Sequence, residues 1–198
     1  MTHSIGILAY GSLIGDPGME LESHIAARID CTTPFAVEFA RSSKSRKGGP
    51  TLVPYESGGP VQAQILTIDL PLEEVINRLY RRELHKVGSD IVYSPPAKTT
   101  PNTVLVKKLL DFEGVDTVLY TSIGANISEL SAEKLARLAV GSAKEITDGR
   151  DGISYLINAI TAGIITPLTP EYERLILNTT GASNLTGALS IVRSAQKT

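Results

Sequence analysis

The stretch that organises this chain is Ile7-Leu8-Ala9-Tyr10-Gly11-Ser12-Leu13-Ile14-Gly15-Asp16-Pro17-Gly18. Its apolar beginning predicts a strand that enters the core, and Gly11 predicts the start of a loop that Gly15, Pro17 and Gly18 continue. Glycine allows amide N–H groups to approach an anion closely. We therefore interpret this stretch as a binding loop that acts through its backbone.

Length and charge narrow the class of protein. The chain has 198 residues, which predicts a single domain over residues 1–198. Its 19 Lys and Arg residues against 21 Asp and Glu residues give a net charge of −2, which argues against nucleic acid or an anionic membrane as the partner. The sequence has neither a secretory leader pattern nor a run of about 20 apolar residues. We expect a soluble, cytoplasmic protein with a small-molecule partner, and the oligomeric state stays open.

Several common kinds of site are excluded by the motifs that they would need. Cys31 is the only cysteine, so an intrachain disulfide is excluded, which fits the reducing cytoplasm. No two His or Cys residues have metal-ligand spacing, and the N-terminal loop lacks the glycine patterns of dinucleotide sites and P-loops. Ser12 lacks the G-x-S-x-G frame of a nucleophilic serine. We predict neither a metal nor a cofactor.

The order of the predicted elements indicates the fold class. After the first strand, strand-like runs are expected at residues 35–40, 51–55, 61–68, 91–93, 103–106 and 115–123, and one helix at about 72–85. Further helices are expected from about 131, over about 152–162 and from 169, and the tail from 181 is weakly patterned. Runs of strands followed by runs of helices predict an α+β fold with six or seven strands.

The helix expected over about 72–85 contains an unusual acid. One face carries the apolar side chains Leu72, Val75, Ile76, Leu79 and Tyr80, and the other carries Glu73, Glu74, Asn77, Arg78, Arg81 and Arg82. The apolar stripe continues to Glu83, and a carboxylate on that face is costly unless it is paired or lines a cavity. Either the helix frays before position 83, or Glu83 is a placed functional group.

A glycine loop and one partly buried acid fit a particular chemistry. A carboxylate in a half-buried pocket can accept and return a proton near neutral pH. This suits an acyl transfer in which the substrate carries its own nucleophile. The loop would then offer N–H groups to a substrate carboxylate or to the oxyanion that develops at the reacting carbonyl.

Two motifs in this sequence resemble the γ-glutamylcyclotransferase superfamily. Tyr10-Gly11-Ser12-Leu13 is similar to the family's loop after its first strand, and residues 79–83 fall where the family has its L-D-x-x-E helix end. Residues 39–53 are similar to the family's second block. Residues 149–156 resemble the ChaC-type branch, and we place the chain with the ChaC-type and AIG2-like members.

The resemblance implies a fold, a reaction and a set of site residues. The fold would be a mixed β-barrel of six or seven strands with packed helices. The reaction would be lyase or transferase chemistry that releases 5-oxoproline from glutathione, a γ-glutamyl amino acid or a γ-glutamyl amine. The resemblance implies Glu83 as the catalytic acid and base, and a substrate-binding loop of Tyr10, Gly11, Ser12 and Leu13. It further suggests the side chains of Arg41 and Tyr93 for carboxylate and hydroxyl contacts.

Two departures from the family pattern support an alternative. Tyr80 stands where the family usually has Asp, and Gln64 stands where a glycine is common. The alternative is a non-catalytic module with the same fold that binds a small anion or a partner.

Overall fold

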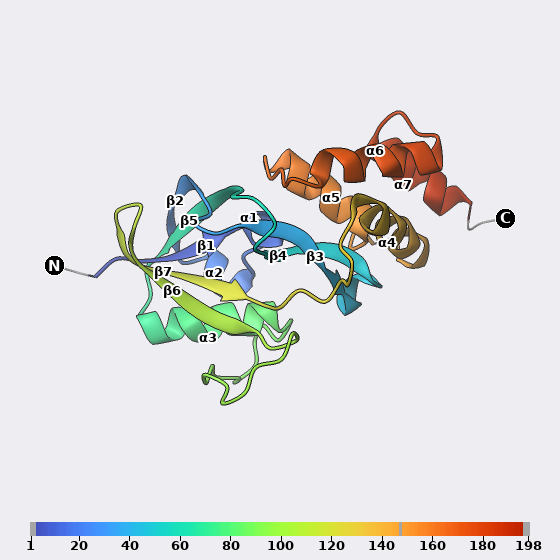
Figure 1. Ribbon diagram of the computed structural model, residues 1–198. Coiled ribbons are helices and arrows are strands. Elements are labelled where there is room, and N and C mark those ends of the chain that lie inside the picture. The colour runs from blue at the N-terminus through green and yellow to red at the C-terminus, as the bar shows by residue number, and fades with distance from the viewer. Residues whose placement is uncertain (1–2, 147, 196–198) are drawn as a thin grey trace. The chain divides into compact units, whose positions relative to one another are not determined.

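The computed structural model describes residues 3–146 and 148–195. Contacts divide the chain into two compact units, each assembled from two segments of sequence. The first unit takes residues up to 33 and residues 62–124, and the second takes residues 34–61 and those from 125 onward. We describe each unit by itself, with the elements labelled as in Figure 1.

The first unit is built on a mixed five-stranded sheet. Its strands lie in the order β2 (Ile25–Thr32), β5 (Gln62–Ile68), β1 (Ile5–Ala9), β7 (Val115–Ser122) and β6 (Leu105–Phe112). The central strand β1 is antiparallel to β5, with Leu8 opposite Ile65, and parallel to β7, with Gly6 opposite Val118. The strand expected first in the sequence is therefore in the middle of the sheet.

The strands confirm an α+β fold, but the expected barrel is wrong. Within the described residues, β2 and β6 lie at opposite edges of the five-stranded sheet and do not pair with each other. β3 (Val37–Ser43) and β4 (Gly49–Pro54), which a barrel would have to include, pair with one another as a separate two-stranded sheet. The sheet of the first unit is thus open at both edges.

Three helices complete the first unit: α1 (Ser12–Gly15), α2 (Met19–Glu22) and α3 (Leu72–Glu83). The apolar stripe of α3 packs as expected, because Val75 and Leu79 are fully buried in one cluster with Ile7, Ala9 and Leu119 of the sheet. Acidic residues occupy the first turn of α3 and basic residues its last turn, which complements the helix dipole. The packing of Val75 and Leu79 thus fixes α3 against β7 and against β1, the strand that precedes the glycine loop.

The second unit combines the β3–β4 hairpin with four helices. A short 3-10 helix, η1 (Lys44–Arg46), joins the two strands, and the helices are α4 (Ala132–Glu145), α5 (Gly152–Thr161), α6 (Thr169–Thr180) and α7 (Leu185–Ser194). Phe39 of the hairpin meets the rings of Tyr155 and Tyr172 edge to face, with centroids 6.1 and 5.5 Å apart. The hairpin is therefore part of the helical core of this unit.

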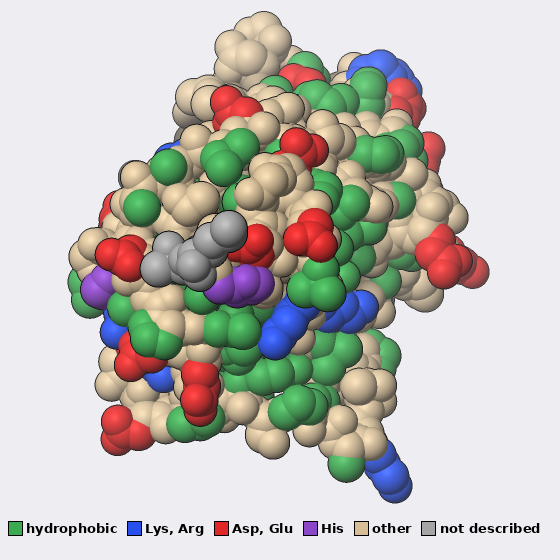
Figure 2. Space-filling model, turned by 90° about the vertical axis from the view of Figure 1, so that its left-hand side faces the viewer, with side chains coloured by type: hydrophobic (Ala, Val, Ile, Leu, Met, Phe, Trp, Pro, Cys, Tyr) green, Lys and Arg blue, Asp and Glu red, His purple; other side chains and the backbone are tan. Residues whose placement is uncertain are grey.

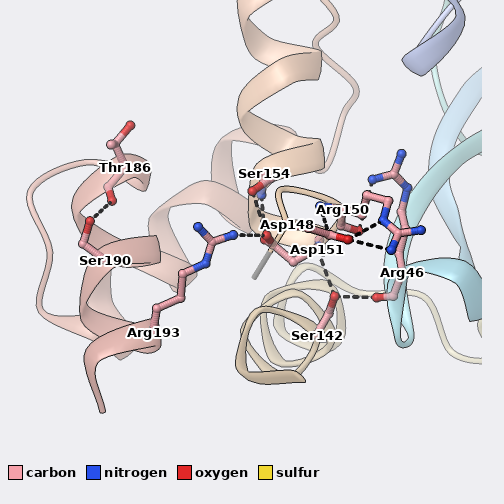
Figure 3. A network of polar contacts seen from close by, with 10 residues as sticks. Arg46, Ser142, Asp148, Arg150, Asp151, Ser154, Thr186, Ser190 and Arg193 are labelled. Atoms are coloured by element: carbon pink, nitrogen blue, oxygen red, sulfur yellow. Dashed lines mark hydrogen bonds and ion pairs between the residues drawn. The ribbon is translucent and has the colours of Figure 1, made fainter. Parts of the chain in front are cut away.

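A buried carboxylate ties the helices of the second unit together (Figure 3). Asp151 is fully buried and caps α5, where its Oδ1 accepts a hydrogen bond from the Ser154 amide at 2.8 Å. Its Oδ2 accepts one from Nη2 of Arg193 on α7 at 2.9 Å. Ser142 of α4 accepts from the Gly152 amide at 3.0 Å and donates to the carbonyl of Arg46. These contacts join α4, α5, α7 and the hairpin loop.

Some expected elements differ from those observed. The predicted strand at 91–93 is wrong, because these residues lie in an irregular segment between α3 and β6. The weakly patterned tail from 181 contains α7, which Asn184 caps through the Gly187 amide at 2.8 Å. Among the described residues, no helix has the length and apolar composition needed to cross a bilayer.

The surface carries charges of both signs. On the face drawn in Figure 2, acidic side chains are spread widely, basic ones form small groups, and histidines lie close to carboxylates. One such contact joins His3 Nδ1 to Asp116 Oδ2 at 3.7 Å. Hydrogen bonds from the side chain and the amide of Ser4 to Asp116 lower the pKa of that carboxyl group. They fix the beginning of β1 beside β7.

Candidate functional site

The glycine loop leaves the central strand through a special backbone conformation. Gly11 has φ 66° and ψ −135°, a region that side chains disfavour, and it directs the chain into α1. The side chain of Leu13 is 5% exposed and belongs to the same buried cluster as Val75 and Leu79 of α3. It therefore anchors the loop in the hydrophobic core. The hydroxyl of Tyr10 donates to the carbonyl of Thr121 in β7 at 3.0 Å. The first amides of α1, at Ser12 and Leu13, have no acceptor within the helix.

Glu83 is the last residue of α3 and not part of a frayed end. Leu84 caps the helix, with its amide bonded to the Tyr80 carbonyl at 3.0 Å, and His85 turns the chain with φ 54°. The side chain of Glu83 is 23% exposed, which places it between the buried stripe and solvent. The carboxylate is therefore accessible and still held within the fold.

Arg82 connects Glu83 to the glycine loop. Its Nη1 donates to Glu83 Oε1 at 2.7 Å, and its Nη2 donates to Ser12 Oγ at 3.3 Å. Nε and Nη2 both donate to the Asp16 carbonyl, at 3.1 and 2.6 Å. A Cβ at Gly18 would lie 3.1 Å from Cγ of Arg82, so a glycine leaves room for the arginine stem. One guanidinium thus contacts the proposed base and the proposed binding loop.

The position of Arg82 corrects the helical-face prediction. Spacing assigns this residue to the solvent face of α3, but its side chain is only 12% exposed. The loop and α1 come from a distant part of the sequence and cover the end of α3, which periodicity within the helix cannot register. The sequence offers one local indication that an arginine pairs with Glu83, because two arginines directly precede this acid at the end of an amphipathic helix.

The two carboxylate oxygens of Glu83 differ in their contacts. Oε1 is held by Arg82, whereas Oε2 accepts no hydrogen bond from any described residue. A carboxylate with one fixed and one open oxygen has a defined direction in which it can accept a proton. The hydroxyl of Ser12 accepts a hydrogen bond from the same guanidinium.

A second ion pair holds the segment that follows α3. Arg81 donates to Glu20 Oε2 through Nε at 2.9 Å and through Nη2 at 2.7 Å, and it also donates to the Ile91 carbonyl at 3.2 Å. Glu20 accepts in addition from the amide of Gly88. Although burial acts in the opposite direction, these hydrogen bonds from Arg81 and Gly88 lower the pKa of Glu20. The Arg81–Glu20 ion pair, through its contacts with Gly88 and Ile91, fixes the segment that follows Glu83.

Tyr93 and Tyr80 form an aromatic pair in the same unit as Glu83. Their rings meet edge to face with centroids 5.0 Å apart. The amide of Tyr93 donates to Asn77 Oδ1 at 2.9 Å, and its hydroxyl oxygen accepts from the Val106 amide at 3.2 Å. Tyr80 therefore has a packing role here.

Two further residues singled out in the sequence, Gln64 and Arg41, lie elsewhere in the fold. Gln64 bridges β5 and β2, where it donates to Asp30 Oδ1 at 2.9 Å and accepts from Arg28 at 3.3 Å. Arg41 belongs to β3 of the second unit, and partial burial lowers the pKa of its guanidinium. The structure thus brings Glu83 and residues 10–13 together within one unit, and gives Gln64 a cross-strand role.

Among the described residues, two features bear on metal and thiol chemistry, namely the arrangement of possible metal ligands and the state of the Cys31 thiol. Over residues 3–146 and 148–195, no three His, Cys, Asp or Glu side chains gather as metal ligands would. Cys31 is buried, and this burial, with smaller contributions from the charges of Glu113 and Asp30, raises the pKa of its thiol to about 11. A protonated, buried thiol is a poor nucleophile.

Comparison with models of known protein families and with curated proteins yields no match to this chain.

Proposed function

We propose that this chain is a γ-glutamylcyclotransferase-type enzyme that releases 5-oxoproline from a γ-glutamyl compound. The compound would be glutathione, a γ-glutamyl amino acid or a γ-glutamyl amine. The observation that carries the proposal is the Arg82 guanidinium, which contacts both the Glu83 carboxylate and the Ser12 hydroxyl. The two features singled out by the resemblance share this contact although they are far apart in the sequence.

In the proposed reaction the substrate attacks itself. The neutral α-amine of the glutamyl group forms a C–N bond with the γ-carbonyl carbon, and its nitrogen passes one proton to Glu83 as that bond forms. The bond from that carbon to the leaving nitrogen then breaks, and Glu83 returns the proton to that nitrogen. The products are 5-oxoproline and a free amine or peptide. Neither a metal nor a covalent enzyme intermediate is required for this balance of atoms and charges.

The residues of the site divide this work. Oε2 of Glu83 exchanges the proton, and Arg82 fixes the carboxylate through Oε1. The first amides of α1, at Ser12 and Leu13, would face the glutamyl carboxylate or the oxyanion that develops at the γ-carbonyl. Holding the substrate in its bent conformer removes much of the entropic barrier to ring closure.

The test is the release of 5-oxoproline from a panel of γ-glutamyl compounds, measured by liquid chromatography and mass spectrometry. We expect Glu83→Gln to lose at least about 10²-fold in turnover, as removal of a general acid and base does. Glu73→Gln is the matched control, because Glu73 is an exposed acid in the first turn of the same helix. Equal turnover by the wild type and Glu83→Gln would exclude Glu83 as the base.

A non-catalytic binding module is the second candidate. It is favoured by the ion pair itself, since Arg82 already neutralises the carboxylate that would act as base. A binding module would retain a γ-glutamyl compound without releasing 5-oxoproline, which calorimetry with the same panel would reveal. Turnover well above that of buffer would exclude this candidate.

A further inference from the structure

The second unit carries an apolar groove that the proposed function does not use. It lies between α4 and α6, has a volume of about 480 Å³, and is lined by Ala136, Val140 and Leu175. Gly141 leaves it open, because an added Cβ there would meet no heavy atom within 4 Å. Lys144 stands at its rim. The size falls within the range of small-molecule sites, about 300–1,000 Å³.

A polar hollow of about 520 Å³ adjoins this groove. The two hollows share Glu133 and Arg137 in their walls, and the polar one is completed by Glu129, Ser131 and Lys134 among others. An apolar space therefore continues into a polar one along the surface of α4. Such a pair of spaces fits a molecule with an apolar body and a polar head.

Arg137 lies at the junction and has no partner of its own. It forms no hydrogen bond, ion pair or ring contact with the residues that the structure describes, whereas every other described arginine has at least one such contact. Lys134, in the polar hollow, is engaged by the carbonyl and hydroxyl of Ser128. The guanidinium of Arg137 thus presents its donors to whatever enters the junction.

We propose that this double hollow binds a small amphiphilic carboxylate. The apolar body fills the space above Ala136, Val140 and Gly141, and the carboxylate accepts hydrogen bonds from Arg137. Guanidinium and carboxylate match in planar, bidentate geometry, and such charge-assisted bonds are about twice as strong as neutral ones. The two hollows together are lined by three basic side chains, Lys134, Arg137 and Lys144, and by two acidic ones, Glu129 and Glu133, and this excess of positive charge favours an anion over a cation.

The experiment uses the full chain and a fluorescent probe of the same chemistry, 1-anilinonaphthalene-8-sulfonate. Its fluorescence rises when its apolar body leaves water. Decanoate and decanol, which differ in the charged head, are then added as competitors. We expect wild-type protein to bind the probe, and decanoate to displace it at a concentration at least about tenfold lower than decanol does.

Two variants test the two halves of the site. Arg137→Gln should bring decanoate and decanol to within about twofold of each other, because the head loses its charged partner. Gly141→Leu should weaken probe binding at least about tenfold by filling the groove. Arg150→Gln is the matched control, since Arg150 is an exposed arginine outside the groove that pairs with Asp148. Thermal unfolding of each variant verifies the fold.

Several outcomes would overturn the proposal. They are the absence of probe binding, equal displacement by both competitors in the wild type, and probe binding that neither variant alters. Probe binding that falls as the protein concentration rises, together with a dimer in size-exclusion chromatography, would assign the groove to a second copy of the chain. None of these outcomes depends on release of 5-oxoproline, so this site and the Glu83 site are tested separately.

Discussion

At the scale of single residues, Arg82 does what no other side chain type could do equally well. Its guanidinium reaches the Glu83 carboxylate, the Ser12 hydroxyl and the Asp16 carbonyl at once, across 70 positions of sequence in the case of Ser12. A planar fork with five donors can serve three acceptors in fixed directions. Lysine carries a point charge on a flexible stem and cannot keep all three.

The first prediction concerns the Arg82 guanidinium and rests on the proposed enzyme activity. We expect Arg82→Gln to slow 5-oxoproline release at least about tenfold, because Glu83 loses its fixed orientation, and Arg82→Lys to be intermediate. Arg78→Gln, one turn earlier on α3, is the control, since Arg78 pairs with Glu74 and not with Glu83. The measurement is turnover of the best substrate in the γ-glutamyl panel. Wild-type turnover in Arg82→Gln would show that Glu83 needs no positioning.

A second residue-scale prediction concerns the buried Asp151. Asp151→Ala removes the cap of α5 and leaves Arg193 without its carboxylate, so we expect a loss of about 2–3 kcal/mol in the free energy of unfolding. Asn184→Ala removes only the cap of α7 and should cost about 1 kcal/mol. Urea unfolding followed by circular dichroism measures both. Equal losses in the two variants would mean that the contact with Arg193 contributes nothing.

At the scale of elements, close approach decides which glycines tolerate a side chain. Gly152, at the start of α5, would place a Cβ 2.8 Å from Cα of Ala139 and 2.9 Å from Cδ of Pro50. Gly141, in α4, has open space around it. Two helical glycines of the same unit therefore predict opposite effects of the same substitution.

We expect Gly152→Ala to destabilise the protein by about 1–3 kcal/mol, as overpacking does. Gly141→Ala should instead stabilise it by about 0.5–1 kcal/mol, because alanine loses less conformational entropy in a helix. Denaturant midpoints of the two variants provide the comparison. A gain in stability for Gly152→Ala would mean that α4 and α5 can separate at no cost.

The elements differ in how well sequence predicts them. Helix α3 and helices α4 to α6 carry long apolar stripes, and their spacing predicts them well. Helix α7 has a short stripe, Leu185, Ala188 and Val192, on a small, polar sequence. Strand β2 alternates in exposure only from Arg28 to Thr32, because residues 26–28 are all exposed, so its alternation is too short to mark the whole strand. These two elements form because neighbours from distant sequence cover them, and a local pattern does not contain that information.

The residues of the candidate site also differ in how well sequence predicts them. Glu83 and the glycine loop can be found from sequence, the first as an acid on an apolar stripe and the second by its motif. Arg82 cannot, because it lies in the second of the two segments that form the first unit, whereas its partners Ser12 and Asp16 lie in the first. The barrel could not be tested from sequence for a related reason, because the whole fold sets the pairing partners of β3 and β4. Among the described strands, these two pair with each other and with no other strand.

At the scale of the whole molecule, each unit is assembled from two separate stretches of chain. Residues 34–61, with the β3–β4 hairpin, interrupt the first unit between β2 and β5, and that hairpin packs with the C-terminal helices instead. Neither unit is complete until both of its stretches are present. Global stability is therefore the proper readout for changes in the core of either one.

Global stability should also depend on pH through Cys31. Burial raises the pKa of the native thiol to about 11, whereas the thiol of an unfolded chain titrates near about 8.5. Between these values the unfolded chain loses its proton while the native protein keeps it, so the free energy of unfolding falls as the pH rises from about 8.5 toward 11. Below about pH 8 the thiol is protonated in both states and contributes no pH dependence.

The measurement is the urea midpoint at about pH 7, 9 and 10 in the wild type and in Cys31→Ala. Other groups titrate in both proteins, so the difference between the two curves isolates the thiol. We expect the wild type to lose more stability than Cys31→Ala over this interval. Parallel curves would contradict the assignment of the shift to Cys31.

The central place of β1 also sets an order of events during synthesis. During synthesis β1 is made before β7, with which it pairs so that Ile5 lies opposite Thr117, and the Tyr10 hydroxyl donates to the carbonyl of Thr121. Contacts between residues so distant in sequence form slowly and late. From the time β1 is made until β7 is made, the nascent chain therefore exposes the edge of β1 that β7 later covers, with the glycine loop directly after it.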